Sequence, residues 1–434
     1  MNYPETIAYL YGRLPMFSRI GEAAIKKDLT NTRALCSKLG DPQLKFPTIH
    51  IAGTNGKGST SHMLAAILQT AGYKTGLYTS PHLYDFRERI RINGQMVPEQ
   101  YITQFVSKHQ ELIESIDPSF FEVTVAMAFD HFAEEQVEVA VIETGLGGRL
   151  DSTNIITPVL SLITNIGYDH MNILGNTLEA IASEKAGIIK RGIPVVIGEK
   201  NPLTASVFND KATLEHAPIH FAEDHYRVKH YNAKFKDLEV QVENSASLTT
   251  ATYQLDLPGH YQLKNLLGVL TALDLLKDRG FPVSVEHRRE GLSQVIRSTG
   301  LRGRWEQLRS SPTVVIDVAH NPDGIREVIR QLQQTPHEQL HWILGMVKDK
   351  AVEKVLELLP KEARYYFTKA QLPRALDEKE LFNKASEIGL SGLPFSDVNQ
   401  ALQHALQQAG EKDLILVCGS VFIAGELERN GMFS

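Results

Sequence analysis

Hydrophobic and polar positions follow two alternating patterns over the first two hundred residues of the chain. Short runs of β-branched and other apolar residues at 48–52 and 137–143 predict strands. Apolar residues that recur every three or four positions predict helices, as in 59–71. Strands that alternate with helices form mostly parallel sheets covered on both faces. The same patterns predict strands at 74–78, 159–164 and 194–198, and helices at 3–12 and 28–39.

The pattern changes between residues 224 and 257, where polar and apolar residues alternate strictly. Such alternation predicts strands with one face exposed to water, at 226–231, 238–242 and 251–257. We expect these strands to form a small antiparallel patch. A helix at 261–277 follows it.

A stretch of small and basic residues at 298–304, STGLRGR, predicts a linker between two domains. A chain of 434 residues has room for two or three domains. We therefore expect a larger domain over 1–297 and a smaller α/β domain over 298–434. Expected elements of the second are strands at 313–318, 341–345, 364–367 and 414–418, and helices at 323–333 and 350–359.

Composition narrows the class of protein. The formal net charge is −6, which argues against a general nucleic-acid binder, because such proteins are normally basic. No run approaches the roughly 18–20 apolar residues that span a bilayer, and the N-terminus lacks a signal-peptide pattern. With two cysteines far apart, Cys36 and Cys418, a disulfide framework is not expected. These features predict a cytoplasmic protein without a membrane or nucleic-acid partner.

A glycine-rich loop, GTNGKGS at 53–59, separates the first strand from the helix that follows. Backbone N–H groups of such a loop and the start of the next helix form an anion site. Lys57 would place its ammonium on the outer phosphates of a nucleotide, and Ser59 or a neighbouring hydroxyl could reach a magnesium ion. The usual pattern has Ser or Thr directly after Gly-Lys, whereas Gly58 intervenes here. The alternative is an ordinary tight turn.

Polar side chains follow the ends of several predicted strands, where ligand sites of α/β proteins form. Glu143 precedes the glycines of TGLGG and suits a magnesium ion; the alternative is a carboxylate that caps the next turn. The hydroxyls of Thr79 and Ser80 lie at another strand end. Asp317 closes a strand before His320, and its alternative role is the N-cap of the following helix.

Two further residues carry weaker signals. His170, in YDH after a strand, could bind metal or phosphate, or could be structural. Lys185 lies on a predicted helix and, taken alone, is an ordinary surface lysine.

The run RERIR at 87–91 is locally basic and is typical of a solvated charged face.

Seven motifs occur in a characteristic order: GTNGKGS, TSPH, ETGLGGRLDSTN (143–154), YDH, SEKAG, LRGRWE and DVAHNP (317–322). Together they resemble the folylpolyglutamate synthase and dihydrofolate synthase family, within the Mur ligase group. The resemblance extends from about residue 3 to 425, and the displaced Ser59 is the family's form of the loop. It implies an α/β Mur-ligase fold, with a large phosphate-loop ATPase domain, a small antiparallel patch and a smaller Rossmann-like domain.

The resemblance also implies a reaction. ATP phosphorylates a carboxylate to give an acyl phosphate, and the amine of L-glutamate then displaces phosphate. Acceptors are dihydropteroate, or the γ-carboxylate of a folate such as tetrahydrofolate. Phosphoryl transfer depends on positioning and charge neutralisation, which Lys57 and two magnesium ions would supply.

Site residues carry over from the family by motif. Lys57, Lys185, His170 and His320 are expected at the reacting groups, with Lys185 carbamylated so that it can hold a second magnesium ion. Ser80, Glu143 and His170 match the family's metal ligands. The ATP contacts implied are Thr54, Asn55, Gly56, Lys57, Gly58, Ser59, Asn265, Arg304 and Asp317, and the pterin pocket implied is Phe121, Glu122, Leu150, Asp151 and Ser152.

Two other functions compete with this one. A Mur-type peptidoglycan ligase would share the phosphate loop, but ETGLGGRLDSTN and DVAHNP favour the folate family. A regulatory ATP-binding module without turnover would bind nucleotide but release no phosphate with glutamate. We expect a monomeric enzyme acting on small molecules.

Overall fold

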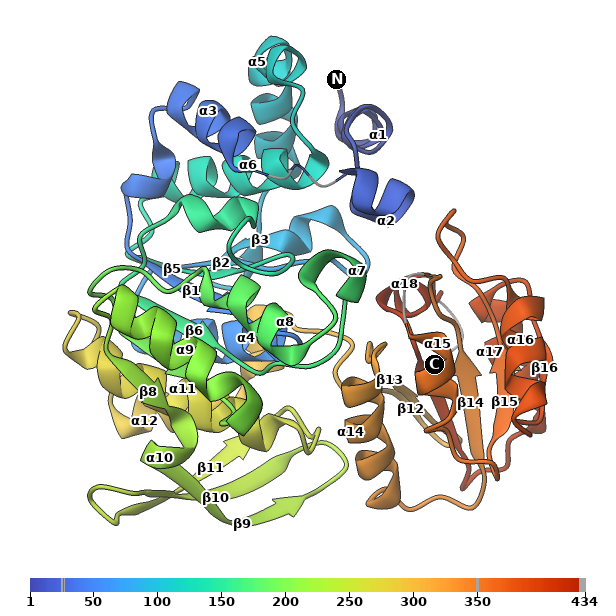
Figure 1. Ribbon diagram of the computed structural model, residues 1–434. Helices are drawn as coiled ribbons and strands as arrows, with labels where there is room; N and C mark the ends of the chain where they lie inside the picture. The colour runs from blue at the N-terminus through green and yellow to red at the C-terminus, as the bar shows by residue number, and fades with distance from the viewer. Residues whose placement is uncertain (25, 27, 349–350, 429–434) are drawn as a thin grey trace.

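The computed structural model describes residues 1–24, 26, 28–348 and 351–428. Three sheets organise it (Figure 1). Sheet A has eight strands in the order β4-β3-β2-β5-β1-β6-β7-β8, sheet B has three in the order β11-β10-β9, and sheet C has six in the order β12-β13-β17-β14-β15-β16. Sheets A and B belong to the N-terminal lobe, defined here as residues 1–299, and sheet C to the C-terminal lobe, which begins at Gly300.

Sheet A is parallel from β2 to β8, with β3 and β4 added antiparallel at one edge. The strands are β1 (Thr48–Ala52), β2 (Thr75–Tyr78), β3 (Ile90–Ile92), β4 (Gln95–Met96), β5 (Val139–Glu143), β6 (Leu160–Ile163), β7 (Val195–Ile197) and β8 (Ile219–Phe221). Every residue of β1 and β5 is buried, as expected for strands covered on both faces.

Alternate side chains of these strands enter two different cores. Val139 and Val141 pack with α4 (Lys57–Thr70), α11 (Gln262–Lys277) and the inner face of sheet B. Ala140 and Ile142 pack on the opposite face, beneath helices of the N-terminal region (Figure 1). Those helices are α1 (Tyr3–Arg13), α3 (Thr30–Lys38), α5 (Glu99–Ile116) and α6 (Phe120–Glu134).

Sheet B confirms the predicted antiparallel patch. It consists of β9 (Tyr226–Ala233), β10 (Leu238–Asn244) and β11 (Thr250–Leu255). In β10 Leu238, Val240 and Val242 are buried, so alternation has turned the apolar face toward α11. The rest of this lobe comprises α2 (Phe17–Ile20), α7 (Met171–Leu174), α8 (Leu178–Ala186), α9 (Pro202–Leu214), α10 (Ala222–His225), α12 (Val285–Ser293) and α13 (Val295–Thr299), with 3-10 turns at Gly21–Ala24, Pro42–Leu44, Phe86–Arg89 and Ser152–Ile155.

Sheet C is parallel except for β12, which pairs antiparallel with β13. Its predicted strands appear as β13 (Thr313–Ile316), β14 (Leu340–Leu344), β15 (Arg364–Phe367) and β17 (Leu414–Cys418). Two edge strands, β12 (Glu306–Ser310) and β16 (Gly392–Pro394), were not predicted, because neither presents a buried apolar run. The helices are α14 (Pro322–Gln333), α15 (Val352–Leu356), α16 (Glu378–Glu387), α17 (Val398–Gln408) and α18 (Val421–Gly425); the predicted start of α15 at residue 350 lies outside the described residues.

The junction between the lobes lies near the end of α13. The predicted boundary at residue 297 falls within α13, which ends at Thr299. We propose Gly300 as the junction, because it adopts a left-handed conformation with φ of 69° that favours glycine. Figure 1 shows the two lobes side by side, with α14 on the side of the C-terminal lobe that faces the N-terminal lobe. Within the described ranges, no helix is long and apolar enough to cross a membrane.

A buried histidine makes the stability of this fold depend on pH. His50 on β1 is fully buried and lies 2.8 Å from the Thr153 hydroxyl, and burial lowers its pKa to about 3. Below pH 6.5 His50 is protonated in the unfolded chain but stays neutral in the folded chain. The free energy of unfolding therefore falls as pH drops. We expect His50 to cost about 2 kcal/mol of unfolding free energy between pH 8 and pH 5.

Urea unfolding of His50→Gln at both pH values tests this expectation. The variant should lose less stability on acidification than the parent protein, whatever its stability at pH 8. Replacing His230 on β9, which is exposed, provides the matched control and should leave the parent's pH dependence in place. An unchanged pH dependence in His50→Gln would contradict the assignment.

Candidate active site

The glycine-rich loop joins β1 to α4 at the centre of the N-terminal lobe. Gly56 is the N-cap of α4, with φ of 82°, and a Cβ there would lie 2.3 Å from Asn265 Oδ1. Only glycine fits this position, since both the conformation and the space exclude a side chain. The first N–H groups of the 14-residue helix α4 are thus directed into the loop, which is the geometry of an anion site.

Two lysines converge on one carbonyl of this loop. Lys57 Nζ donates to the carbonyl oxygens of Gly53 at 3.1 Å and Thr54 at 3.2 Å. Lys185 Nζ, from α8, donates to the same Gly53 oxygen at 2.9 Å. Lys185 is only 3% exposed, so the alternative of a solvated surface lysine is wrong. Its amine lies beneath the phosphate loop.

Glu143 and Ser80 lie together at the ends of β5 and β2. The Ser80 N–H donates to Glu143 Oε2 at 3.3 Å, and Glu143 is 4% exposed. Burial raises the pKa of this carboxyl to about 7, against the opposing effect of Lys57 and Arg304. A buried carboxylate that faces a cationic loop is suited to a bound divalent cation, because the cation would offset the loss of hydration.

Ser59 has a different environment. It is 1% exposed, and its hydroxyl accepts a hydrogen bond from Gln262 Nε2 at 3.1 Å. This contact ties the start of α4 to the start of α11. The Ser59 hydroxyl is thus engaged by Gln262, whereas the backbone N–H of Ser80 contacts Glu143.

The C-terminal lobe contributes Asp317 and Arg304. Asp317 Oδ2 accepts hydrogen bonds from the Tyr261 hydroxyl at 2.8 Å and the Trp305 N–H at 3.0 Å, while Oδ1 accepts from the Ala319 N–H at 2.9 Å. Burial raises the pKa of Asp317. The alternative that Asp317 caps α14 is wrong, because Asn321 is the N-cap. Arg304 Nη2 would be 3.1 Å from a Cβ on Gly58, so the guanidinium lies against the phosphate loop.

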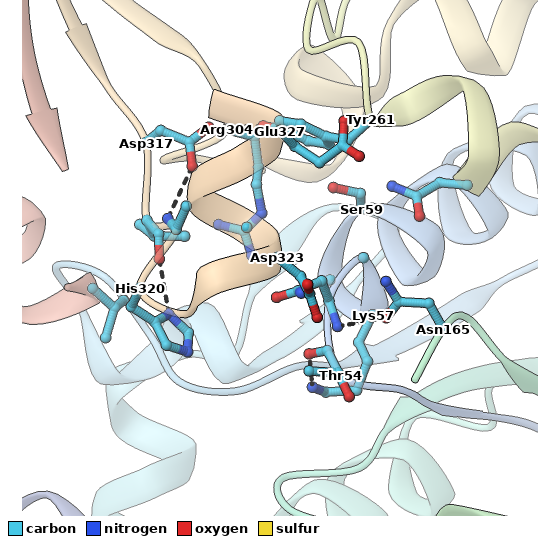
Figure 2. Close-up of a pocket in the computed structure, with 18 of the residues that line it drawn as sticks. Thr54, Lys57, Ser59, Asn165, Tyr261, Arg304, Asp317, His320, Asp323 and Glu327 are labelled. Carbon is cyan, nitrogen blue, oxygen red and sulfur yellow. Dashed lines mark hydrogen bonds between the residues drawn. The ribbon is translucent and has the colours of Figure 1, made fainter. Parts of the chain in front are cut away.

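A cavity of about 570 Å³ joins these groups (Figure 2). Figure 2 shows Thr54, Lys57 and Ser59 on one side of it and Asp317 and His320 on the other. The predicted residues that line it are Thr54, Asn55, Gly56, Lys57, Gly58, Ser59, Ser80, Glu143, Asn265, Arg304, Asp317 and His320. One cavity thus brings together residues of both lobes that are far apart in the chain.

The other predicted residues do not line this cavity. His170 has φ of 49° at the start of α7, and its ring packs edge-on against Phe17, with centroids 5.6 Å apart. Lys185 is buried behind the loop. In the described residues, no group of three or more His, Cys, Asp or Glu side chains could hold a metal. A cation here would use hydroxyl and backbone oxygens as well.

The predicted pterin residues surround the start of α6 and the loop after β5. The Glu122 carboxylate accepts from Ser119 N–H at 2.7 Å, Ser119 Oγ at 2.9 Å and Thr32 Oγ1 at 3.3 Å, as part of a capping box. Asp151 accepts from the Leu146 N–H at 2.8 Å and shapes the glycine-rich loop 145–148. Both carboxylates are buried and already hydrogen-bonded.

Phe121 and Leu150 are the accessible members of the predicted pterin set, and Ser152 is buried. A Cβ on Gly145 would lie 2.5 Å from Phe121 Cζ, so glycine there is what allows the ring to cover the loop. Leu150 is 36% exposed.

Sequence reasoning missed several polar residues at the cavity. Tyr261 holds Asp317, and Asn165 Oδ1 accepts the Asn55 N–H at 2.8 Å. Asp169 and Asn321 connect the lobes. Asp169 and Asn321 lie inside quoted motifs, but their spacing alone does not indicate that they meet.

Comparison with known proteins identifies the relatives of this chain. Residues 51–273 match the Mur ligase middle domain, and residues 303–421 match the Mur ligase glutamate ligase domain. The chain is 33% identical to the dihydrofolate synthase/folylpolyglutamate synthase of Bacillus subtilis, over 98% of both proteins.

Solved structures agree with that relationship. Escherichia coli FolC in complex with DHPP and ADP superposes with a TM-score of 0.86 at 29% identity, over 98% of this chain and 96% of that one. A bifunctional folylpolyglutamate synthase/dihydrofolate synthase with Mn, AMPPNP and L-glutamate bound superposes with a TM-score of 0.83 at 28% identity, over 98% of this chain and 97% of that one.

Proposed function

The chain belongs to the dihydrofolate synthase/folylpolyglutamate synthase family of Mur ligases and catalyses ATP-dependent addition of glutamate to folates, and from that premise we propose that the cavity between its lobes is the active site. The observation that carries this proposal is the meeting of Lys57 and Glu143 with Arg304 and Asp317 around one cavity. Phosphoryl transfer requires this kind of convergence of cations and metal-binding oxygens.

ATP binds along the phosphate loop, from Thr54 to Ser59, with Asn265 and Asp317 as further contacts. Lys57 turns from its loop carbonyls toward the outer phosphates, and Arg304 approaches from the second lobe. Glu143 and Ser80 would hold a magnesium ion. His170 would become its third protein ligand only by moving toward them, because its ring packs against Phe17 and does not line the cavity in this structure. Magnesium held there would supply neutralisation of phosphate charge. The proximity of Ser80 to Glu143 and the high pKa of the Glu143 carboxyl support this metal position.

A carbamate on Lys185 would turn this side chain into an anion that could hold a second magnesium ion. A neutral Lys185 amine adds CO₂ to give a carbamate anion and releases one proton. The buried position beneath the phosphate loop supports this role, since an anion there lies near the metal and not in bulk solvent. The amine's present contact with the Gly53 carbonyl would have to be exchanged for metal ligation.

The acceptor carboxylate attacks the γ-phosphorus and releases ADP, which leaves an acyl phosphate. The amine of L-glutamate then attacks the acyl carbon, phosphate departs, and the amine gives up a proton. His320, at the cavity edge on the second lobe, is placed near the reacting groups. Contact between the lobes excludes water that would hydrolyse the acyl phosphate.

We place the pterin ring against Phe121, with Leu150 beside it and with Glu122, Asp151 and Ser152 at the margins of the pocket. Because Glu122 and Asp151 already accept hydrogen bonds from within the protein, Phe121 would supply most of the contact by stacking. Both dihydropteroate and tetrahydrofolate present a pterin ring and a distal carboxylate, so one pocket serves both.

Parallel assays test the proposal. Phosphate release that depends on ATP and L-glutamate should be observed with dihydropteroate and with tetrahydrofolate, and not with a UDP-muramyl acceptor. Omission of glutamate is the control for uncoupled ATP hydrolysis. Turnover with only one of the two acceptors, dihydropteroate or tetrahydrofolate, would restrict the proposal to the corresponding synthase activity. Turnover only with the UDP-muramyl compound would contradict it.

A further inference from the structure

A polar cluster joins the two lobes beside the phosphate loop. Asp169 comes from the loop between β6 and α7 of the N-terminal lobe, and His320 and Asn321 follow β13 in the C-terminal lobe. Asp169 Oδ2 lies 3.1 Å from His320 Nε2 and accepts from Asn321 Nδ2 at 3.2 Å. One carboxylate oxygen therefore contacts two adjacent residues of the other lobe.

The His320 ring is held from both ends. Nδ1 lies 2.9 Å from the Val318 carbonyl oxygen, and Nε2 faces Asp169. Both ring nitrogens thus face oxygen atoms, one from each lobe, which fixes the orientation of the ring. The Asp169 side chain is 9% exposed and that of His320 is 32% exposed, so the carboxylate is the buried member of this contact.

Asn321 extends the cluster to the phosphate loop. Its amide forms a reciprocal pair with Asn55: Asn321 Nδ2 donates to Asn55 Oδ1 at 3.0 Å, and Asn55 Nδ2 donates to Asn321 Oδ1 at 3.2 Å. Asn321 Oδ1 also accepts the Gly324 N–H at 2.9 Å as the cap of α14. Displacement of the second lobe would therefore pull directly on Asn55.

The neighbourhood of Asn55 transmits such a displacement. The Asn55 N–H is fixed by Asn165 at 2.8 Å, and the Thr54 hydroxyl bonds to the Gly167 backbone at 3.1 Å. Asn165, Gly167 and Asp169 belong to one short segment after β6. This segment supports the phosphate loop and also contacts His320 and Asn321.

We propose that Asp169 is a positioning residue that latches the C-terminal lobe onto the phosphate loop and so couples lobe closure to ATP-dependent ligation. It holds His320 and Asn321, and through Asn321 it sets the position of Asn55. When the latch is released the cavity admits water, and the acyl phosphate is hydrolysed before glutamate attacks. This inference rests on the acyl-phosphate chemistry of the proposed function.

The test compares phosphate released with glutamate incorporated. In the parent enzyme the two should be equal. Asp169→Asn keeps the shape of the side chain but removes the charge that holds His320, and we expect about tenfold slower ligation with at least twice as much phosphate as glutamate product. Assays at saturating magnesium separate this effect from one on the neighbouring His170.

Asn321→Asp tests the latch from the opposite lobe. Its carboxylate can still cap α14, but it loses the amide donor and repels Asp169. The same excess of released phosphate over incorporated glutamate is expected in this variant. If Asp169→Asn fails to fold, Asn321→Asp by itself tests whether the latch couples the two. Asp224→Asn, whose carboxylate pairs with Lys200 on the surface, is the control and should remain fully coupled.

Equal phosphate and glutamate product in both folded latch variants would overturn the inference. Absence of ligation in the parent enzyme would instead contradict the proposed function, so the two failures are distinguishable. A lower ligation rate with full coupling would make Asp169 a structural residue only.

Discussion

Replacing Lys57 by alanine is expected to lower kcat by about three orders of magnitude, with a smaller effect on the folded state. Lys57 is the first residue of α4, and its ammonium already lies on the loop carbonyls of Gly53 and Thr54. As the phosphoryl group leaves, charge develops on oxygens that this ammonium would neutralise. Steady-state phosphate release with saturating ATP, folate and glutamate measures the effect.

A matched control distinguishes the effect of losing the Lys57 charge in the site from the effect of replacing any lysine by alanine. Lys277, the exposed last residue of α11, is suitable, because it lies outside the cavity. Lys277→Ala should retain parent activity. Turnover near the parent rate in a folded Lys57→Ala variant would contradict the assignment of the phosphate loop.

Replacing Lys185 by alanine is expected to lower kcat by about two orders of magnitude or more, because one ligand of the second metal ion would be lost. If that ligand is a carbamate, a small carboxylate such as acetate should partly restore activity by taking its place. An unmodified lysine predicts no such rescue. The measurement is kcat with and without acetate at constant ionic strength.

A direct observation complements the kinetics. The parent enzyme supplied with carbon-13 bicarbonate should show a carbamate resonance that Lys185→Ala lacks. Lys190, which is half-buried and bonds to the Asn154 carbonyl at 3.2 Å, offers a control for other partly buried lysines. An unmodified Lys185 in a mass or density measurement under bicarbonate would contradict the carbamate.

Local sequence was sufficient to predict most of the architecture. The buried runs of β1 and β5, the period of α4 and the alternation in β10 all depend on side chains that are neighbours along the chain. The edge strands β12 and β16 were missed because their sequences carry no such local pattern. An edge strand is half-exposed, so it need not contain a run of apolar residues.

The candidate site divides in the same way. The phosphate loop could be predicted because its glycines and Lys57 are contiguous, and Glu143 because it ends a clear strand. The partner of the Ser59 hydroxyl could not be predicted, since Gln262 lies 203 positions away in the chain. The role of Asp151 in shaping the loop was equally hidden, because the backbone N–H groups that it binds leave no pattern in the sequence. The capping role of Glu122 was readable, since Ser119-Phe120-Phe121-Glu122 has the spacing of a capping box.

By itself, then, the sequence determined the layers of the fold, the nucleotide loop and the membership of a ligase family. The layers and the loop depend on neighbouring residues, and the family on the linear order of seven short motifs, so none of them required a contact between distant residues. Tertiary structure decided which of those residues share one cavity. It buried Lys185 beneath the loop, set His170 against Phe17, and paired Asn55 with Asn321 across 266 positions. Such contacts arise from the packing of two lobes, and that packing depends on the whole surface of each and not on any local pattern.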